Sequence, residues 1–311
     1  MGAGRWDNED FTRYATSSGK SYDAKTKRVN GQTYRSTHLD KEMNPKGVIR
    51  ECVNTAEHPN TIPIILALDV TGSMGSACIE TAQSLAVIME DLYKKYADIE
   101  FMVMGIGDLD YDNAPIQASQ FESDVRIAKW LDKIYMEHGG GGNKFESYTA
   151  AWYFGLYHTK LDAFDKQGRK GIIITMGDEG LNPYLPKERL NNVTGDKNQA
   201  DIETKDLYKA AIEKFDIFHI AVDANDSSYN YHKENIENTF GKLLGNRYKV
   251  ATINGLSTAI TECIDDSQRK NKVKFATTED NTGRFDILKM FGIGNKNDDV
   301  KTNNDLNEIT W

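Results

Sequence analysis

The stretch that decides the fold reads Thr61-Ile62-Pro63-Ile64-Ile65-Leu66-Ala67-Leu68-Asp69-Val70-Thr71-Gly72-Ser73-Met74-Gly75-Ser76. Its first half is an apolar run that ends in an acid, as expected of a strand buried on both faces. Its second half carries oxygen-bearing side chains and glycines, which indicate a tight loop. Apolar residues at helical spacing follow from Ile79 onward, so the stretch predicts a buried strand, a loop and a helix.

The same alternation continues to about residue 265. We expect further strands at residues 99–106, 118–121, 171–176, 217–222 and 247–252. We expect helices at residues 79–96, 125–136, 147–160, 200–215, 232–244 and 256–264. Strands separated by helices predict an α/β fold of the doubly wound kind, with a mostly parallel sheet and helices on both faces.

Polar extensions flank this central domain, which we assign to residues 60–265. Residues 1–59 form an expected arm against the main domain, with a tight hairpin at the Asn30-Gly31 pair and a short helix at residues 45–54. Residues 266–311 form a polar tail. Its apolar island at residues 285–293 is either packed in a groove of its own domain or a docking segment, with Phe285, Leu288 and Phe291 as contacts.

Composition excludes several classes of protein. The net charge of −9 gives no support for a nucleic-acid binder, which would usually be basic. No apolar run reaches the roughly 18 residues that span a bilayer, and the first ten residues show no secretory signal. Three cysteines without a closely spaced pair indicate reduced thiols. We therefore expect a cytoplasmic protein that binds neither nucleic acid nor membrane.

Three oxygen-bearing side chains stand at alternate positions where the first strand ends: Asp69, Thr71 and Ser73. Alternate side chains of an extended or turning segment point the same way, and ligands of parallel α/β sheets bind at this edge. Oxygen ligands suit a hard cation, with Mg²⁺ first and Mn²⁺ or Ca²⁺ as alternatives. The competing interpretation is an ordinary helix-capping turn.

Asp-x-Thr-x-Ser after a buried first strand resembles the metal-ion-dependent adhesion site of von Willebrand factor A (VWA) domains. The resemblance covers about residues 60–265 and implies a Rossmann-like fold with metal ligands on two further loops. In the glycine loop at residues 139–146, Asn143 occupies a ligand position and Glu146 is a later acid. The family usually has a threonine at that ligand position, so an amide oxygen would replace a hydroxyl. In the loop at residues 174–180, Asp178 is the expected ligand and Glu179 the alternative.

This resemblance implies metal-dependent protein recognition, in which an Asp or Glu of a partner protein completes the coordination of the metal. By resemblance alone, intracellular VWA proteins often act as adaptors beside AAA+ ATPases of the MoxR type. The acidic loop that begins at Asp108 is either a solvated turn or part of the rim around the metal. It lacks the glycine and the final glutamate of a calcium loop.

Two other functions stay open. A metal-dependent hydrolase would need a second Asp two residues after Asp69, where Thr71 stands, and a basic clamp, for which only Lys144 is near. His138 as a general base is the remaining argument for catalysis, and we expect no enzyme. The second alternative is a structural or assembly component of a larger, possibly viral, complex that uses its terminal arms more than its metal.

Overall fold

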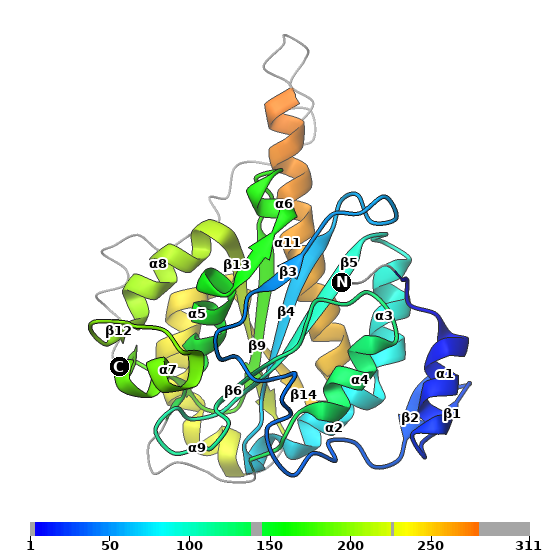
Figure 1. The fold of residues 1–311 in the computed structure, drawn as a ribbon, viewed down its shortest axis with the longest axis horizontal. Coiled ribbons are helices and arrows are strands. Elements are labelled where there is room, and N and C mark those ends of the chain that lie inside the picture. The colour runs from blue at the N-terminus through cyan, green and yellow to red at the C-terminus, as the bar shows by residue number, and fades with distance from the viewer. Residues whose placement is uncertain (1–3, 138–144, 225–226, 280–311) are drawn as a thin grey trace.

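A six-stranded sheet runs through the centre of the computed structural model, which describes residues 4–137, 145–224 and 227–279 (Figure 1). The strand order is β14-β13-β9-β4-β5-β6, and every neighbouring pair is parallel except the antiparallel pair of β5 and β6. The strands are β4 (Ile62–Asp69), β5 (Ile99–Ile106), β6 (Ile116–Ala118), β9 (Gly171–Gly177), β13 (Phe215–Asp223) and β14 (Tyr248–Thr252). The predicted mixed α/β architecture with a mostly parallel sheet is confirmed.

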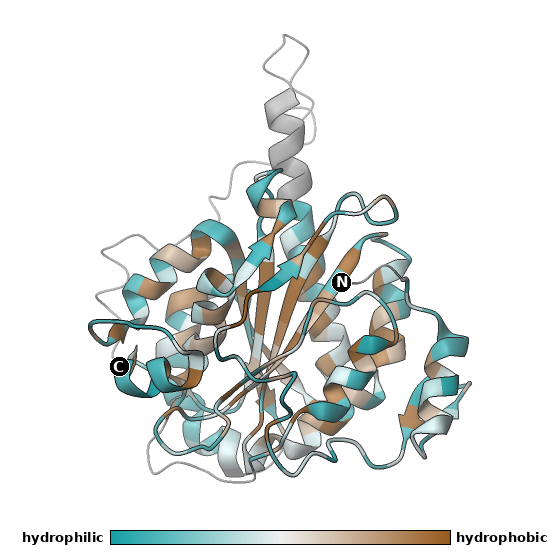
Figure 2. Cartoon of the chain, in the orientation of Figure 1, coloured by the Kyte–Doolittle hydropathy of each residue, from teal (hydrophilic) through white to brown (hydrophobic). Residues whose placement is uncertain are grey.

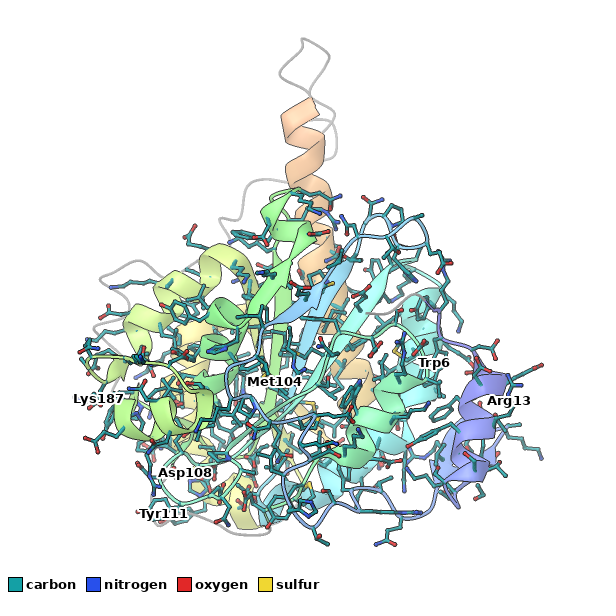
Figure 3. All side chains as sticks on the ribbon, viewed as in Figure 1. Trp6, Arg13, Met104, Asp108, Tyr111 and Lys187 are labelled. Carbon is teal, nitrogen blue, oxygen red and sulfur yellow. The ribbon has the colours of Figure 1, made fainter. Side chains whose placement is uncertain are left out.

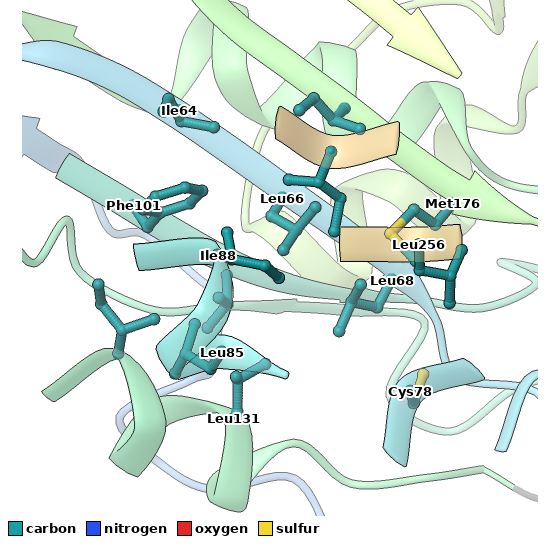
Figure 4. Packing of buried hydrophobic residues seen from close by; sticks show 14 of the residues in the cluster. Ile64, Leu66, Leu68, Cys78, Leu85, Ile88, Phe101, Leu131, Met176 and Leu256 are labelled. Atoms are coloured by element: carbon teal, nitrogen blue, oxygen red, sulfur yellow. The ribbon is translucent and has the colours of Figure 1, made fainter. Parts of the chain in front are cut away.

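Strand β4 lies at the centre of the fold, and all eight of its residues are buried. Its side chains alternate between two apolar clusters, with Ile64, Leu66 and Leu68 in one and Ile65 and Ala67 in the other. Figure 2 shows the apolar strands enclosed between the helices, and Figure 4 shows the first cluster at close range. The uninterrupted apolar run of the sequence therefore reflects a strand that is covered on both faces.

Helices contribute to both clusters. The first cluster contains residues of α2 (Gly75–Gln83), α3 (Leu85–Tyr93), α4 (Arg126–Lys133) and α11 (Leu256–Glu279). The second contains residues of α5 (Thr149–Tyr157), α7 (Lys187–Thr194), α8 (Thr204–Lys214), α9 (Ser227–Ile236), the π-helix η2 (Glu237–Gly241) and α10 (Lys242–Leu244). In the part of the chain that is described, none of the helices is long and apolar enough to cross a membrane.

The N-terminal arm packs on the first cluster. It consists of α1 (Asn8–Ser17) and an antiparallel hairpin of β1 (Ser21–Asp23) and β2 (Arg28–Asn30). Phe11 and Val29 are buried in the cluster, and the Arg28 guanidinium binds both carboxylate oxygens of Glu80 on α2. The hairpin was predicted at the wrong turn. The chain reverses at residues 24–27, where Lys27 takes a positive φ of 56°, and Asn30 only ends β2.

The short helix predicted at residues 45–54 is wrong. Residues Arg50–Cys52 form strand β3, which pairs in parallel with β8 (Thr159–Leu161). The guanidinium of Arg50 also donates to the backbone oxygens of Glu42 and Ala118. The pairing with β8 therefore outweighs the weak local preference for a helix. The same pairing ends α5 at Tyr157, before the predicted end at residue 160.

Other predicted boundaries shift for similar reasons. The helix expected at residues 79–96 begins at Gly75 and is divided at Ser84, whose hydroxyl donates to Glu80. The strand expected at 118–121 ends at Ala118, because the Ser119 hydroxyl takes the next hydrogen bond from Val103 N. Helix α11 continues past residue 265.

The remaining short elements are β7 (Phe145–Glu146), α6 (Asp162–Asp165), β10 (Gly180–Leu181), β11 (Tyr184–Leu185), β12 (Ile202–Glu203), and the 3₁₀ turns η1 (Gly72–Met74), η3 (Gly245–Arg247) and η4 (Ile253–Gly255).

Packing of the arm predicts a stability difference within one helix. Replacing the buried ring of Phe11 by alanine should lower the free energy of unfolding by about 3–5 kcal/mol, because a cavity remains in the first cluster. Arg13 lies on the outer side of the same helix (Figure 3), so Arg13→Ala should change the free energy of unfolding by less than about 0.5 kcal/mol. Urea unfolding of both variants measures this. Equal effects would show that the arm does not share the core.

Candidate metal centre

The candidate site lies where two neighbouring parallel strands end. Asp69 is the last residue of β4, and Asp178 directly follows β9. The two strands pair with Leu68 opposite Met176, so both acids leave the sheet at its carboxyl edge. The acids are 109 positions apart in sequence (178 minus 69), and the register of the sheet brings their loops together.

Asp69 is completely buried, and described donors occupy both of its carboxylate oxygens. Its Oδ1 accepts from the backbone N of Thr71 at 2.9 Å and from the Thr71 hydroxyl at 2.5 Å. Its Oδ2 accepts from the hydroxyl of Tyr148 at 2.7 Å. Three hydrogen bonds therefore fix the carboxylate above the end of β4.

The third residue of the motif joins the first loop to the loop after β9. The Ser73 hydroxyl donates to Oδ1 of Asp178 at 3.1 Å. Thr71 stands at the N-cap of η1, but its side chain makes no capping hydrogen bond, and no side chain caps α2. The helix-capping interpretation of the motif is therefore wrong, because these hydroxyls bind carboxylates instead of helix N–H groups.

Two more predicted acids lie close to this group. Strand β7 pairs in parallel with β10, opposing Glu146 to Leu181 just past the Asp178 loop. Glu146 is 1% exposed, and its Oε2 has no hydrogen-bond partner among the residues that the structure describes. The Glu179 carboxylate lies 3.7 Å from Nε2 of His232. Glu146 thus lies beside Asp69 and has a buried carboxylate oxygen for which the structure describes no donor.

Burial and crowding raise the pKa values of these acids. Burial, and then the charge of Asp178, raise the pKa of Asp69 to about 7. Burial, and then the charge of Asp69, raise the pKa of Glu179 to about 8, and the same two causes hold the pKa of Glu146 well above its usual range. These carboxylates repel one another when they are ionised, so a cation among them would be favoured.

The residues at this edge fit a hard divalent cation. Asp69, Thr71, Ser73 and Asp178 offer carboxylate and hydroxyl oxygens, the ligand type of Mg²⁺. Across residues 4–137, 145–224 and 227–279, no three His, Cys, Asp or Glu side chains are grouped so that they could hold a metal by themselves. A cation here would therefore depend on the hydroxyl oxygens of Thr71 and Ser73 as well as on carboxylates.

The acidic loop after β5 lies at the same edge, where Asp108 and Tyr111 are seen in Figure 3. Its carboxylates bind the backbone of the loop itself, since Asp108 Oδ1 accepts from Asp110 N at 2.7 Å and Asp112 Oδ2 accepts from Asp108 N at 2.8 Å. The charge of Asp108 also helps to raise the pKa of Glu146. The loop is therefore a turn held by its own hydrogen bonds beside the candidate site.

Several predicted residues lie outside the described part of the chain. These are the ligand position Asn143 with its glycines and with His138 and Lys144, and the docking residues Phe285, Leu288 and Phe291. The four described positions of the predicted ligand set, Asp69, Thr71, Ser73 and Asp178, come together through the contacts given above.

Tyr148 is not among the site residues expected from the sequence and falls only within the helix predicted at residues 147–160. The structure shows that its hydroxyl binds Asp69 and that its ring lies against Gly177, where an added Cβ would meet the hydroxyl oxygen at 1.8 Å. The available signal was a tyrosine, rather than a phenylalanine, at a fully buried position, since a buried hydroxyl requires a partner.

No family model and no curated protein matches this chain. Among solved structures, it is similar to the pilus adhesin SpaC from Lactobacillus rhamnosus GG in its open conformation, at 14% identity and a TM-score of 0.46. It is also similar to proximal thread matrix protein 1 from the mussel byssus, at 14% identity and a TM-score of 0.40. The matches cover 71% and 66% of this chain, but only 31% and 47% of those structures. Such low scores support no inference about function.

Proposed function

We propose that this protein binds one divalent cation, Mg²⁺ first, at Asp69, Thr71, Ser73 and Asp178, and recognises a partner protein through it. The observation that carries the proposal is the Ser73–Asp178 hydrogen bond of 3.1 Å, which joins two loops at the ends of neighbouring strands beside buried Asp69. Such a set of oxygens, with Oε2 of Glu146 nearby and without a described donor, suits a hard cation.

The topology of the sheet supports the finer assignment to a doubly wound, Rossmann-like VWA fold. Strands β4, β5 and β6 follow one another toward one edge, whereas β9, β13 and β14 follow toward the other. The strand order therefore reverses between β4 and β9. Ligands of open α/β sheets bind at the carboxyl ends of the strands at such a reversal, and this is where Asp69 and Asp178 lie.

Binding fits this site better than catalysis. Thr71 and Ser73 are neutral ligands, so Asp69 and Asp178 alone would balance the charge of the cation. If one of these two carboxylates acted through a water molecule, the cation would stay electrophilic. The octahedral preference of Mg²⁺ then leaves a position for an Asp or Glu of the partner. The Thr71 hydroxyl donates to Asp69 and the Ser73 hydroxyl to Asp178, and no histidine is among the hydrogen-bond partners that the structure gives these two hydroxyls.

Assembly through the terminal arms has less support. The N-terminal aromatics contact their own domain, with Phe11 buried in the core and Tyr14 packed against it. The Tyr14 hydroxyl donates to Asp132 at 2.5 Å, and Lys20 pairs with the same carboxylate. These groups are therefore already used within the chain.

Metal binding predicts a specific stabilisation. Mg²⁺ should raise the melting temperature of the wild-type protein, by an amount equivalent to about 2.7 kcal/mol at a concentration 100-fold above its Kd, because it binds only the folded site. Asp69→Asn should abolish the rise. Asp206→Asn, at an exposed position on α8, should keep it. Thermal unfolding with Mg²⁺ and with chelator measures this, and identical melting temperatures in wild type would refute the metal site.

The raised pKa of Asp69 predicts a pH dependence in the metal-free protein. Its ordinary value is 3.8, against about 7 when folded, so between these values the folded state holds more protons than the unfolded state. Its contribution to the free energy of unfolding therefore falls as pH rises through this window. From about pH 5 to about pH 8, wild type should lose more stability than Asp69→Asn in chelator, and Mg²⁺ should reverse the loss. Urea titrations measure it, and parallel pH profiles would contradict the assignment.

Partner recognition predicts that capture depends on both the metal and Asp69. Tagged wild-type protein in Mg²⁺ should retain a partner that is lost with chelator and that Asp69→Asn never retains, because the cation bridges the two proteins. Quantitative mass spectrometry of the captured proteins compares the three conditions. Substitution of the partner's bridging Asp or Glu by its amide should reproduce the loss. Capture of the same proteins in all three conditions would exclude metal-mediated recognition and favour assembly through other surfaces.

A further inference from the structure

We propose that the hydroxyl of Tyr148 positions the metal-binding loops, so that Tyr148 sets the affinity of the site although it is not itself a ligand. This inference rests on the proposed function, because it concerns how the same cation is held. Tyr148 immediately precedes α5, on the segment that follows β7, and it is completely buried. It therefore belongs to neither of the loops that carry Asp69 and Asp178.

The hydroxyl contacts both of these loops. It donates to Oδ2 of Asp69 at 2.7 Å, and the backbone N–H of Glu179 points to it with an N–O distance of 3.4 Å. Asp69 ends β4, and Glu179 lies one residue beyond Asp178 after β9. One oxygen atom from the segment between β7 and α5 thus joins the ends of two neighbouring strands.

The position of this hydroxyl is fixed by packing. The ring of Tyr148 makes edge contacts with His219 at 5.3 Å and with Phe240 at 5.5 Å between ring centroids. On the loop side it lies against Gly177, where a Cβ would lie 1.8 Å from the hydroxyl oxygen. Glycine at this position, the last of β9, leaves the room in which the hydroxyl reaches Asp69.

The chemical consequence concerns the orientation of Asp69. Thr71 supplies two donors to Oδ1, whereas Tyr148 is the donor that the structure gives to Oδ2. Removing the Tyr148 hydroxyl leaves one side of a buried carboxylate without this donor, and it separates Asp69 from the backbone of Glu179. Hydrogen-bond partners of metal ligands typically change metal affinity by about 10- to 100-fold when they are removed.

A matched control lies on α5, the helix that Tyr148 immediately precedes. Tyr153 is also buried, and its hydroxyl donates to the Asp196 carboxylate at 2.6 Å. Asp196 follows α7, away from the ends of β4 and β9. Tyr153→Phe therefore removes the same kind of tyrosine–aspartate hydrogen bond as Tyr148→Phe, without touching the candidate metal centre.

The experiment compares wild type, Tyr148→Phe and Tyr153→Phe by titration calorimetry with Mg²⁺ alone and by amide hydrogen exchange in chelator. We expect Tyr148→Phe to weaken Mg²⁺ binding by about 10- to 100-fold and Tyr153→Phe to leave it unchanged. In the metal-free protein, amides of residues 69–73 and 178–180 should exchange faster in Tyr148→Phe only. Gly177→Ala, which keeps the hydroxyl but displaces it, should weaken Mg²⁺ binding in the same way and serves if Tyr148→Phe does not fold.

The outcomes separate this inference from the proposed function. If wild type shows no Mg²⁺ binding, both are overturned. If wild type binds Mg²⁺ and Tyr148→Phe binds it with the same affinity, only the role of Tyr148 is overturned. Equal losses in Tyr148→Phe and Tyr153→Phe would show a general effect of destabilised packing and would also overturn it. Weaker binding with unchanged exchange in both loops would contradict positioning as the cause.

Discussion

Parallel pairing of β4 with β9 holds the acids Asp69 and Asp178 at the ends of neighbouring strands, and the candidate site depends on this constraint. The backbone hydrogen bonds of the sheet fix both strand ends, so the acids cannot separate without disrupting the centre of the core. Their charges raise the pKa values of the buried acids around them. The fold therefore places an unfavourable group of like charges at the end of a fully buried strand, as is common at functional sites.

Hydroxyl groups make this arrangement stable enough to form. The donors to Asp69 are Thr71, which follows it closely in the chain, and Tyr148, which immediately precedes α5; the donor to Asp178 is Ser73. Ser73 and Tyr148 each lie on a different element from the carboxylate that they bind. In a buried setting such hydrogen bonds favour the ionised form of a carboxylate, which is the form that binds a cation.

The two faces of the sheet have separate roles. The N-terminal arm covers helices of the first cluster through apolar contacts and through the Arg28–Glu80 pair, and it adds to the core. The second face carries α5, and Tyr148, which immediately precedes it, binds Asp69 at the carboxyl edge. The arm therefore adds to the first cluster, whereas Tyr148 belongs to the second.

Local pattern in the sequence determined the class of fold and the set of oxygen-bearing side chains at the end of the first strand. An eight-residue apolar strand ending in Asp69 requires cover on both faces, and the spacing of Asp69, Thr71 and Ser73 depends on local geometry alone. Only the tertiary structure decided that Arg50–Cys52 is a strand, because it pairs with β8, which is distant in the chain. It also decided that Tyr148 joins two loops. Periodicity identifies a buried face, but it carries no information on which distant group a buried hydroxyl will meet.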